Sequence, residues 1–124
     1  MPTIFSHPLV PLALGFGLGK KRIPKRLLLA GVAASILPDL DVVAFSFGIP
    51  YEHEFGHRGF SHSFFFAAVM ALLGTCAHRW LHCSFGVAFL FLFFASASHG
   101  VLDAFTNGGL GIAFLWPWSD ERYF

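Results

Sequence analysis

Histidines and aspartates recur in this sequence at four separated places, each beside or within an apolar stretch. The candidate set is His7, Asp39, Asp41, His57, His62, His99 and Asp103. Imidazole and carboxylate groups are ligands that zinc, manganese and iron accept in proteins. Within a membrane, an ionisable side chain costs about 2.5–3.5 kcal/mol on insertion scales, so such a group usually has a function and a partner. A divalent cation would satisfy this set.

The spacing of the residues within each stretch supports a shared centre more strongly for some pairs than for others. His99 and Asp103 are four residues apart in HGVLD, so they share one face of a helix and can chelate, although such pairs also merely stabilise helices. Asp39 and Asp41 flank Leu40, and in a regular helix their side chains would diverge by about 200°. Pro38 can break or kink the helix there, which would let both carboxylates turn toward one centre.

The stretch GHRGFSHS (residues 56–63) holds His57 and His62 where an apolar segment begins. A helix that begins near Ser61 would bring His57 in from the loop and His62 in from the first turn. Ser61 or Ser63 can cap that helix. Arg58 has two interpretations: its guanidinium binds a phosphate or carboxylate, or it extends to the membrane interface.

The composition places these residues in a membrane. The 124 residues are 56% hydrophobic and 12% charged, with a mean hydropathy of +0.67. Soluble domains carry about 25% charged residues, so we expect an all-α fold, a small polytopic helical membrane bundle, as a single domain over residues 1–124. A net charge of +1 argues against nucleic acid as the main partner. The lipid bilayer is the expected partner, and the oligomeric state is left open.

Four apolar segments form the predicted bundle, over residues 4–19, 27–49, 61–81 and 85–105. The last three have the length of about 20 residues that a membrane helix needs. The first is short, with two prolines suited to a first helical turn. The stretch TNGG (106–109) predicts a turn after the fourth segment.

Charge placement predicts the orientation. Six of the eight Lys and Arg residues flank the first and third connections between segments: Lys20, Lys21, Arg22, Lys25, Arg26 and Arg79. Such an excess marks the cytoplasmic side, so we expect a multi-pass membrane protein with this end in the cytoplasm. All seven acidic residues fall in the opposite half. At about 1.5 Å per residue, the histidines and aspartates reach one layer near the outer boundary, so the site is expected on the periplasmic or extracellular side.

Mixed His and Asp ligation predicts one or two divalent cations, with Zn²⁺ preferred over Mn²⁺ or Fe²⁺ and one aspartate bridging two ions. Cys76 and Cys83 are interpreted as small buried hydrophobic residues rather than as a disulfide or metal pair. Trp116 and Trp118 fit an aromatic belt at the interface.

These motifs in their order, LPDLD, GHRGFSHS and SHGVLDAFTNGGLGIAFLWP, together with a histidine near the N-terminus, resemble the YdjM-like family. Its members are bacterial inner-membrane proteins described as membrane-bound metal-dependent hydrolases. The resemblance runs over residues 7–117. It implies a multi-pass helical fold in the bacterial inner (plasma) membrane. It also implies metal or active-site roles for His7, Asp39, Asp41, His57, His62, His99 and Asp103. Two departures are a serine at Ser61, where the family usually has threonine, and an end at Phe124, which members usually pass and which suggests a C-terminal truncation.

The favoured function is metal-assisted hydrolysis of a phosphoester or lipid-like substrate that enters sideways from the lipid. Asp41 or His57 would take the proton from water, and Arg58 would hold an anionic group. Two alternatives stay open. One is a non-catalytic metal-binding membrane protein with a structural, transport or envelope-stress role, and the other is a helical bundle whose polar groups only pair with one another.

Overall fold

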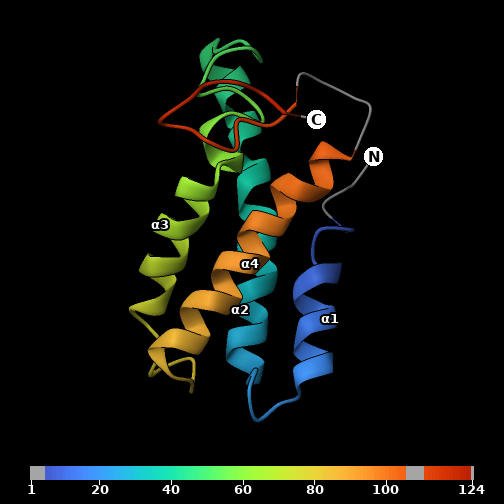
Figure 1. Ribbon diagram of the computed structural model, residues 1–124, viewed down its shortest axis with the longest axis vertical. Coiled ribbons are helices and arrows are strands. Elements are labelled where there is room, and N and C mark those ends of the chain that lie inside the picture. The colour runs from blue at the N-terminus through green and yellow to red at the C-terminus, as the bar shows by residue number, and fades with distance from the viewer. Residues whose placement is uncertain (1–4, 106–110, 124) are drawn as a thin grey trace.

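The computed structural model describes residues 5–105 and 111–123, whose regular structure is helical apart from one isolated β-bridge. Its elements in chain order are α1 (Leu9–Leu18), α2 (Lys25–Ile36), the 3₁₀ helices η1 (Leu37–Phe47) and η2 (Phe60–His62), α3 (Phe64–Thr75) and α4 (Phe85–Ala104). The four α-helices run up and down with their connections at the two ends of the bundle (Figure 1). This architecture confirms the all-α prediction.

The second predicted segment is one helical rod that tightens partway along. The α-helix α2 passes directly into the 3₁₀ helix η1 at Leu37, next to Pro38. Proline lacks the N–H that an α-helix needs and its ring clashes with the preceding turn, so the backbone changes winding here without stopping. The combined rod, Lys25–Phe47, and α4 are the two helices in the described chain that are long and apolar enough to cross a membrane.

The third predicted segment is shorter than expected. A helix over residues 61–81 was predicted, but α3 covers only the 12 residues Phe64–Thr75. Beyond it the chain forms turns, closed by a hydrogen bond between His78 Nδ1 and the Cys83 carbonyl at 3.0 Å. His82 has a φ of +61°, which no α-helix accommodates. The first segment is short, as predicted, because α1 has 10 residues.

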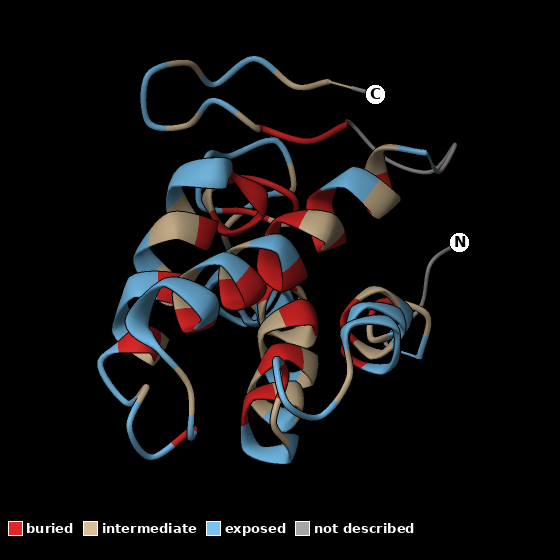
Figure 2. Ribbon diagram, turned by 60° about the horizontal axis from the view of Figure 1, so that its bottom comes forward, coloured by how far each residue is buried: buried red, intermediate tan, exposed pale blue. Residues whose placement is uncertain are grey.

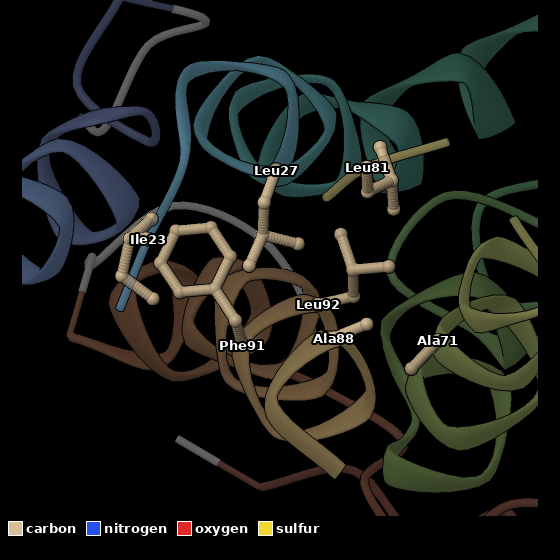
Figure 3. Packing of buried hydrophobic residues seen from close by; sticks show 7 residues of the cluster. All are labelled: Ile23, Leu27, Ala71, Leu81, Ala88, Phe91 and Leu92. Atoms are coloured by element: carbon tan, nitrogen blue, oxygen red, sulfur yellow. The ribbon is translucent and has the colours of Figure 1, made fainter. Parts of the chain in front are cut away.

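The helix α4 is the centre of the packing and contacts the other three α-helices. Leu27 of α2 and Phe91 and Leu92 of α4 form the middle of a buried apolar cluster (Figure 3). Gly31 lies against the Phe91 ring, where no side chain would fit. Small residues at helix contacts let backbones approach closely, which is how membrane helices pack in the absence of a hydrophobic drive between them.

Large apolar side chains cover much of the outer surface. Phe16 of α1 is 77% exposed, Leu73 of α3 61% and Phe94 of α4 54%. The outward faces of the helices are exposed along much of their length (Figure 2). Monomeric soluble proteins rarely expose continuous apolar patches of this kind, whereas a lipid-facing surface requires them.

The two cysteines do not follow the prediction of buried hydrophobic residues. Cys76 is exposed and Cys83 is half-buried, and both are free thiols. They lie just beyond α3, in the turns that shorten it, which explains their exposure. Burial raises the pKa of the Cys83 thiol, so this residue is a poor thiolate ligand at neutral pH. The predicted TNGG turn lies outside the described residues.

The bundle has chemically different ends. The α1–α2 and α3–α4 connections, which carry the basic residues, lie at one end of the bundle (Figure 1). The segments around η2 and residues 111–123 lie at the other. Arg26 ties the two basic connections together, because its Nη1 donates to the Trp80 carbonyl at 3.0 Å and its guanidinium stacks on the Trp80 ring.

Candidate metal centre

The end opposite the basic connections gathers histidines and aspartates from several elements. Asp39 and Asp41 come from η1, His62 from η2, and His99 and Asp103 from the last turns of α4. His7 comes from the segment just before α1, and His57 from the loop before η2. The structure therefore brings together all seven residues that the sequence predicted: six form two adjoining groups, and Asp41 contacts His57 and His62 of the second group.

The first group is His7, Asp39, His99 and Asp103, whose ligand atoms all lie within 4.8 Å of one another. His99 Nε2 is 3.1 Å from Asp39 Oδ1 and 3.3 Å from Asp103 Oδ2. The His7 ring stacks on the His99 ring with centroids 3.6 Å apart. His7, His99 and Asp103 are at most 3% exposed, so these groups are removed from water.

The hydrogen bond of His99 fixes which nitrogen faces the group. Its Nδ1 donates to the Ser35 carbonyl at 2.7 Å, because a carbonyl oxygen only accepts. In a neutral ring, Nε2 then carries a lone pair that points at two carboxylates. Such an arrangement repels unless a positive charge lies between the atoms or on the ring. Metal-ligating histidines commonly donate their second N–H to a carbonyl in this way.

His7 supports the same conclusion independently. It is 1% exposed, and neither of its ring nitrogens has a hydrogen-bond partner among the described residues. Its Nε2 lies 3.4 Å from Asp103 Oδ1. A buried polar nitrogen without a partner costs about 1–3 kcal/mol, and a cation bound to Nε2 would remove that cost. The donor set therefore fits a divalent metal.

The second group is Asp39, His57 and His62, again with ligand atoms within 4.8 Å of one another. Asp39 belongs to both groups. His62 connects them as well, since its Nε2 lies 3.1 Å from Asp103 Oδ2 of the first group. Its Nδ1 lies 3.1 Å from Asp41 Oδ2. Two adjoining groups that share a carboxylate are the arrangement expected of a two-metal site.

Asp41 stands outside both groups because its oxygens are already occupied. Oδ1 accepts from His57 Nδ1 at 2.6 Å, and Oδ2 accepts from the Arg58 backbone N–H at 3.0 Å and from the Ser61 hydroxyl. A carboxylate held in this way orients the imidazoles beside it. The two aspartates of PDLD thus do not meet at one point, because Asp39 belongs to both groups whereas Asp41 contacts only His57 and His62 of the second group.

Two further predictions about GHRGFSHS are refined. Ser63, not Ser61, caps α3, because its hydroxyl accepts from the Phe66 N–H at 3.0 Å. His62 lies in the 3₁₀ turn η2 rather than in the first turn of the α-helix, which begins only at Phe64. Arg58 is 4% exposed with a φ of +64°, and its Nε lies 3.8 Å from Asp103 Oδ2. An arginine that extends to the membrane interface does not fit these observations.

Sequence reasoning missed Arg122, which holds the loop around His57. Its guanidinium donates to the carbonyls of Tyr51, His53 and His57 at 3.0–3.1 Å. Burial lowers its pKa, although a guanidinium stays charged at neutral pH. Backbone carbonyls leave no mark in a sequence, so no motif pointed to this contact or to the Ser35 carbonyl.

The C-terminal segment covers the site end of the bundle (Figure 1). Ile112 and Tyr123 form an antiparallel bridge, and the Ala113 N–H donates to the Arg58 carbonyl at 3.2 Å. Trp116 packs against Phe55 and Phe60, while Trp118 is 78% exposed. The position of both at the membrane interface stays a prediction. Residues 111–123 therefore brace the loop that carries His57 and Arg58.

Access to the site is narrow. The side chain of Asp39 is 27% exposed and that of His57 is 19% exposed. A separate cavity of about 250 Å³ between η1 and α3 reaches Asp41 and Ser61, and its walls are mainly apolar, including Leu40, Phe66 and Met70.

A family model described as YdjM inner membrane protein matches residues 1–124. The chain is also 50% identical, over 125 aligned residues, to Inner membrane protein YbcI of Escherichia coli (strain K12). That alignment covers 100% of this chain and 72% of the relative. No solved structure matches.

Proposed function

Because the chain belongs to the YdjM family and is thus a bacterial inner membrane protein, we propose that it is a membrane-bound metal-dependent hydrolase. Its substrate is a phosphoester, carried by an amphiphilic molecule. The observation that carries the proposal is the pair of adjoining His/Asp groups, drawn from separate elements and buried in an otherwise apolar bundle. Such a cluster is costly in a membrane unless it serves a function.

The proposed ligands divide between two positions. His7, Asp39, His99 and Asp103 would hold one cation, and Asp39, His57 and His62 would hold a second, with Asp39 shared. Zn²⁺ is the favoured ion, with Mn²⁺ or Fe²⁺ as alternatives. When bound, a divalent cation supplies Lewis acidity, which acidifies water and polarises the bond to be cleaved.

The protein's own groups would then move the proton and hold the anion. His57 and Asp41 form a 2.6 Å pair at the more exposed side of the site. When only the first position holds a cation, His57 Nε2 stays free, and in that state this pair is the proposed general base. The carboxylate fixes the imidazole tautomer and stabilises its protonated form. Arg58 is the only guanidinium aimed at the groups among the described residues, and we assign it the role of holding a substrate oxygen.

The mainly apolar cavity beside Asp41 and Ser61 supports an amphiphilic substrate. Its walls suit a hydrocarbon chain, while its inner end meets polar atoms of the site. An amphiphile could therefore enter from the lipid between η1 and α3 with its polar group leading. On the positive-inside rule, this end of the bundle faces the periplasm.

Removal of His99 tests the proposal. Purified His99→Ala protein in detergent is expected to lose bound metal, measured by elemental analysis, and to lose hydrolysis in a screen of phosphoester and lipid substrates. His53→Ala is the matched control, because His53 is exposed, lies in the same loop as His57 and belongs to neither group. Circular dichroism checks that both variants keep the helical fold. Unchanged turnover in the His99→Ala protein would contradict the proposal.

One observation favours a second candidate, a non-catalytic metal-binding protein. His62, His99 and Asp103 are at most 3% exposed, and buried, fully enclosed ligands are typical of structural metal sites. Metal binding would be lost in the His99→Ala protein under both candidates. Only the enzyme would turn over a substrate, so a wild-type protein that holds metal but cleaves nothing in the screen would favour this alternative.

A further inference from the structure

The basic end of the bundle holds a pocket of its own, far from the His/Asp groups. Its volume is about 650 Å³, and its lining comes from both connections at this end. Lys21 and Arg22 come from the α1–α2 connection, and Arg79 and His82 from the α3–α4 connection. Cations that are distant in sequence thus surround one space.

Nothing in the described chain neutralises these cations. The connections contain no Asp or Glu, and none of the ion pairs among the described residues involves Lys21, Arg22 or Arg79. All three side chains are exposed. Like charges that converge without a counterion repel one another, so an anion bound in the pocket would lower the free energy of this end.

An apolar groove continues directly from the basic pocket. A second cavity, of about 510 Å³ between α1 and α4, shares Arg22 and Val87 with the first. Its walls include Leu14, Leu90 and Phe94. Along α4, the distance from Val87 to Phe94 is about 10 Å at 1.5 Å per residue, a depth that lies within one leaflet of a hydrocarbon core about 30 Å thick.

We propose that this composite surface is a binding site for one anionic phospholipid. The phosphate lies among Lys21, Arg22 and Arg79, and an acyl chain follows the groove between α1 and α4. Basic pockets beside membrane helices recognise anionic head groups in this way. The pairing of a cationic pocket with an adjoining apolar groove selects a lipid rather than a free anion. The proposal concerns the opposite end from the His/Asp site and does not depend on its chemistry.

Native mass spectrometry of the full chain tests this proposal, after purification in detergent doped with either phosphatidylglycerol or phosphatidylcholine. The wild-type protein is expected to retain one phosphatidylglycerol and no phosphatidylcholine. The double variant Lys21→Gln with Arg79→Gln is expected to bind phosphatidylglycerol about 30-fold more weakly, since each cation contributes about fivefold.

The matched control is Lys20→Gln with Lys25→Gln, which removes the same charge from the same end but from outside the pocket. Its affinity is expected to stay within about twofold of wild type at physiological salt, where screening weakens distant charges. Equal losses in both double variants would mean only general attraction to the membrane and would overturn the site. Equal retention of the two lipids would overturn it as well.

A further variant separates a lipid from a free phosphate. Val87→Trp fills the junction between pocket and groove and leaves every cation in place. It is expected to abolish retention of phosphatidylglycerol, while millimolar inorganic phosphate does not displace that lipid from the wild-type protein. Retention in the Val87→Trp protein, with helicity unchanged by circular dichroism, or displacement by phosphate would show that the groove plays no part.

Discussion

At the scale of single residues, the candidate site depends on which nitrogen of each imidazole is already occupied. The Nδ1 of His99 is hydrogen-bonded to the Ser35 carbonyl, and the Nδ1 of His57 is hydrogen-bonded to the Asp41 carboxylate. In both rings, Nε2 is thereby left for a further partner. Neighbouring groups that fix a tautomer also fix the direction of the remaining lone pair, which determines whether separate side chains can share one ion.

Ser61 offers a direct test of how much the hydrogen bonds to the Asp41 carboxylate stabilise the site. Its hydroxyl donates to the buried carboxylate of Asp41, so Ser61→Ala removes a hydrogen bond to a charged group. We expect it to lower the free energy of unfolding by about 1.5–3 kcal/mol, measured by thermal unfolding in detergent. Ser61→Thr keeps the hydroxyl and is expected to unfold near the wild-type temperature. An alanine variant as stable as wild type would mean that this bond contributes nothing.

The types and depths of the seven candidate residues were enough to predict that they converge, because ionisable groups in apolar segments need partners. Their division into two groups was not predictable, since it depends on how η1 winds after Pro38. Their role as metal ligands stays a prediction. The contacts of Arg122 and His99 with backbone carbonyls were also beyond the sequence, because any residue can supply a carbonyl.

At the scale of elements, the close approach of η2 to α4 brings His62 within reach of Asp103. Gly100 makes this possible, because a Cβ atom there would lie 2.8 Å from the His62 carbonyl oxygen. The stretch ASASHG (residues 95–100) supplies small residues on this part of α4, and Ala95, Ser96 and Gly100 are buried.

Gly100→Ala is expected to push η2 away from α4, lowering both the unfolding temperature and the metal content. Gly86→Ala is the matched control in the same helix, because its added methyl group meets nothing within 4 Å. In that exposed helical position alanine is favoured over glycine by about 0.5–1 kcal/mol. Opposite effects of the two substitutions on thermal unfolding would support the packing argument, and equal effects would contradict it.

The C-terminal segment provides a second test at this scale. Arg122→Gln removes the guanidinium that joins the carbonyls of Tyr51, His53 and His57. We expect faster hydrogen exchange in residues 51–60 and unchanged exchange in α2 and α4, measured by mass spectrometry. Lys25→Gln, which removes an exposed charge at the other end, is expected to leave the exchange of this loop unchanged. If hydrogen exchange in residues 51–60 of the Arg122→Gln protein were as slow as in the wild type, other contacts would hold the loop.

Helix lengths were the weakest part of the prediction from sequence. Hydropathy continues almost unbroken from residue 61 to 81, yet α3 ends at Thr75 and the chain then turns. The turns are held by the local His78–Cys83 hydrogen bond and by the positive φ of His82. Neither has a signal in hydropathy. The combined rod Lys25–Phe47 and α4 matched their predicted segments closely, because length and apolarity decide such cases.

At the scale of the whole molecule, the bundle separates charge along its axis. Cations gather at the end with the α1–α2 and α3–α4 connections, and the acidic residues lie toward the end that holds the His/Asp groups (Figure 1). An inner membrane protein with this asymmetry is expected to keep its basic end in the cytoplasm. The same orientation would expose the candidate site to the periplasm and the proposed lipid site to the cytoplasmic leaflet.

The natural cysteines can test this orientation, because both lie at the basic end and Cys76 is exposed. In a Cys83→Ser variant, Cys76 is the only thiol. A membrane-impermeant maleimide is expected to label it only after spheroplasts are permeabilised. Glu52→Cys, in a background with both natural cysteines replaced by serine, places a thiol on the exposed loop at the opposite end and is expected to react in intact spheroplasts.

Cys83 is removed because burial raises its thiol pKa, so its slow reaction with the maleimide would complicate the comparison. Labelling of Cys76 in intact spheroplasts would reverse the assigned orientation and place both the His/Asp groups and any hydrolysis on the cytoplasmic side.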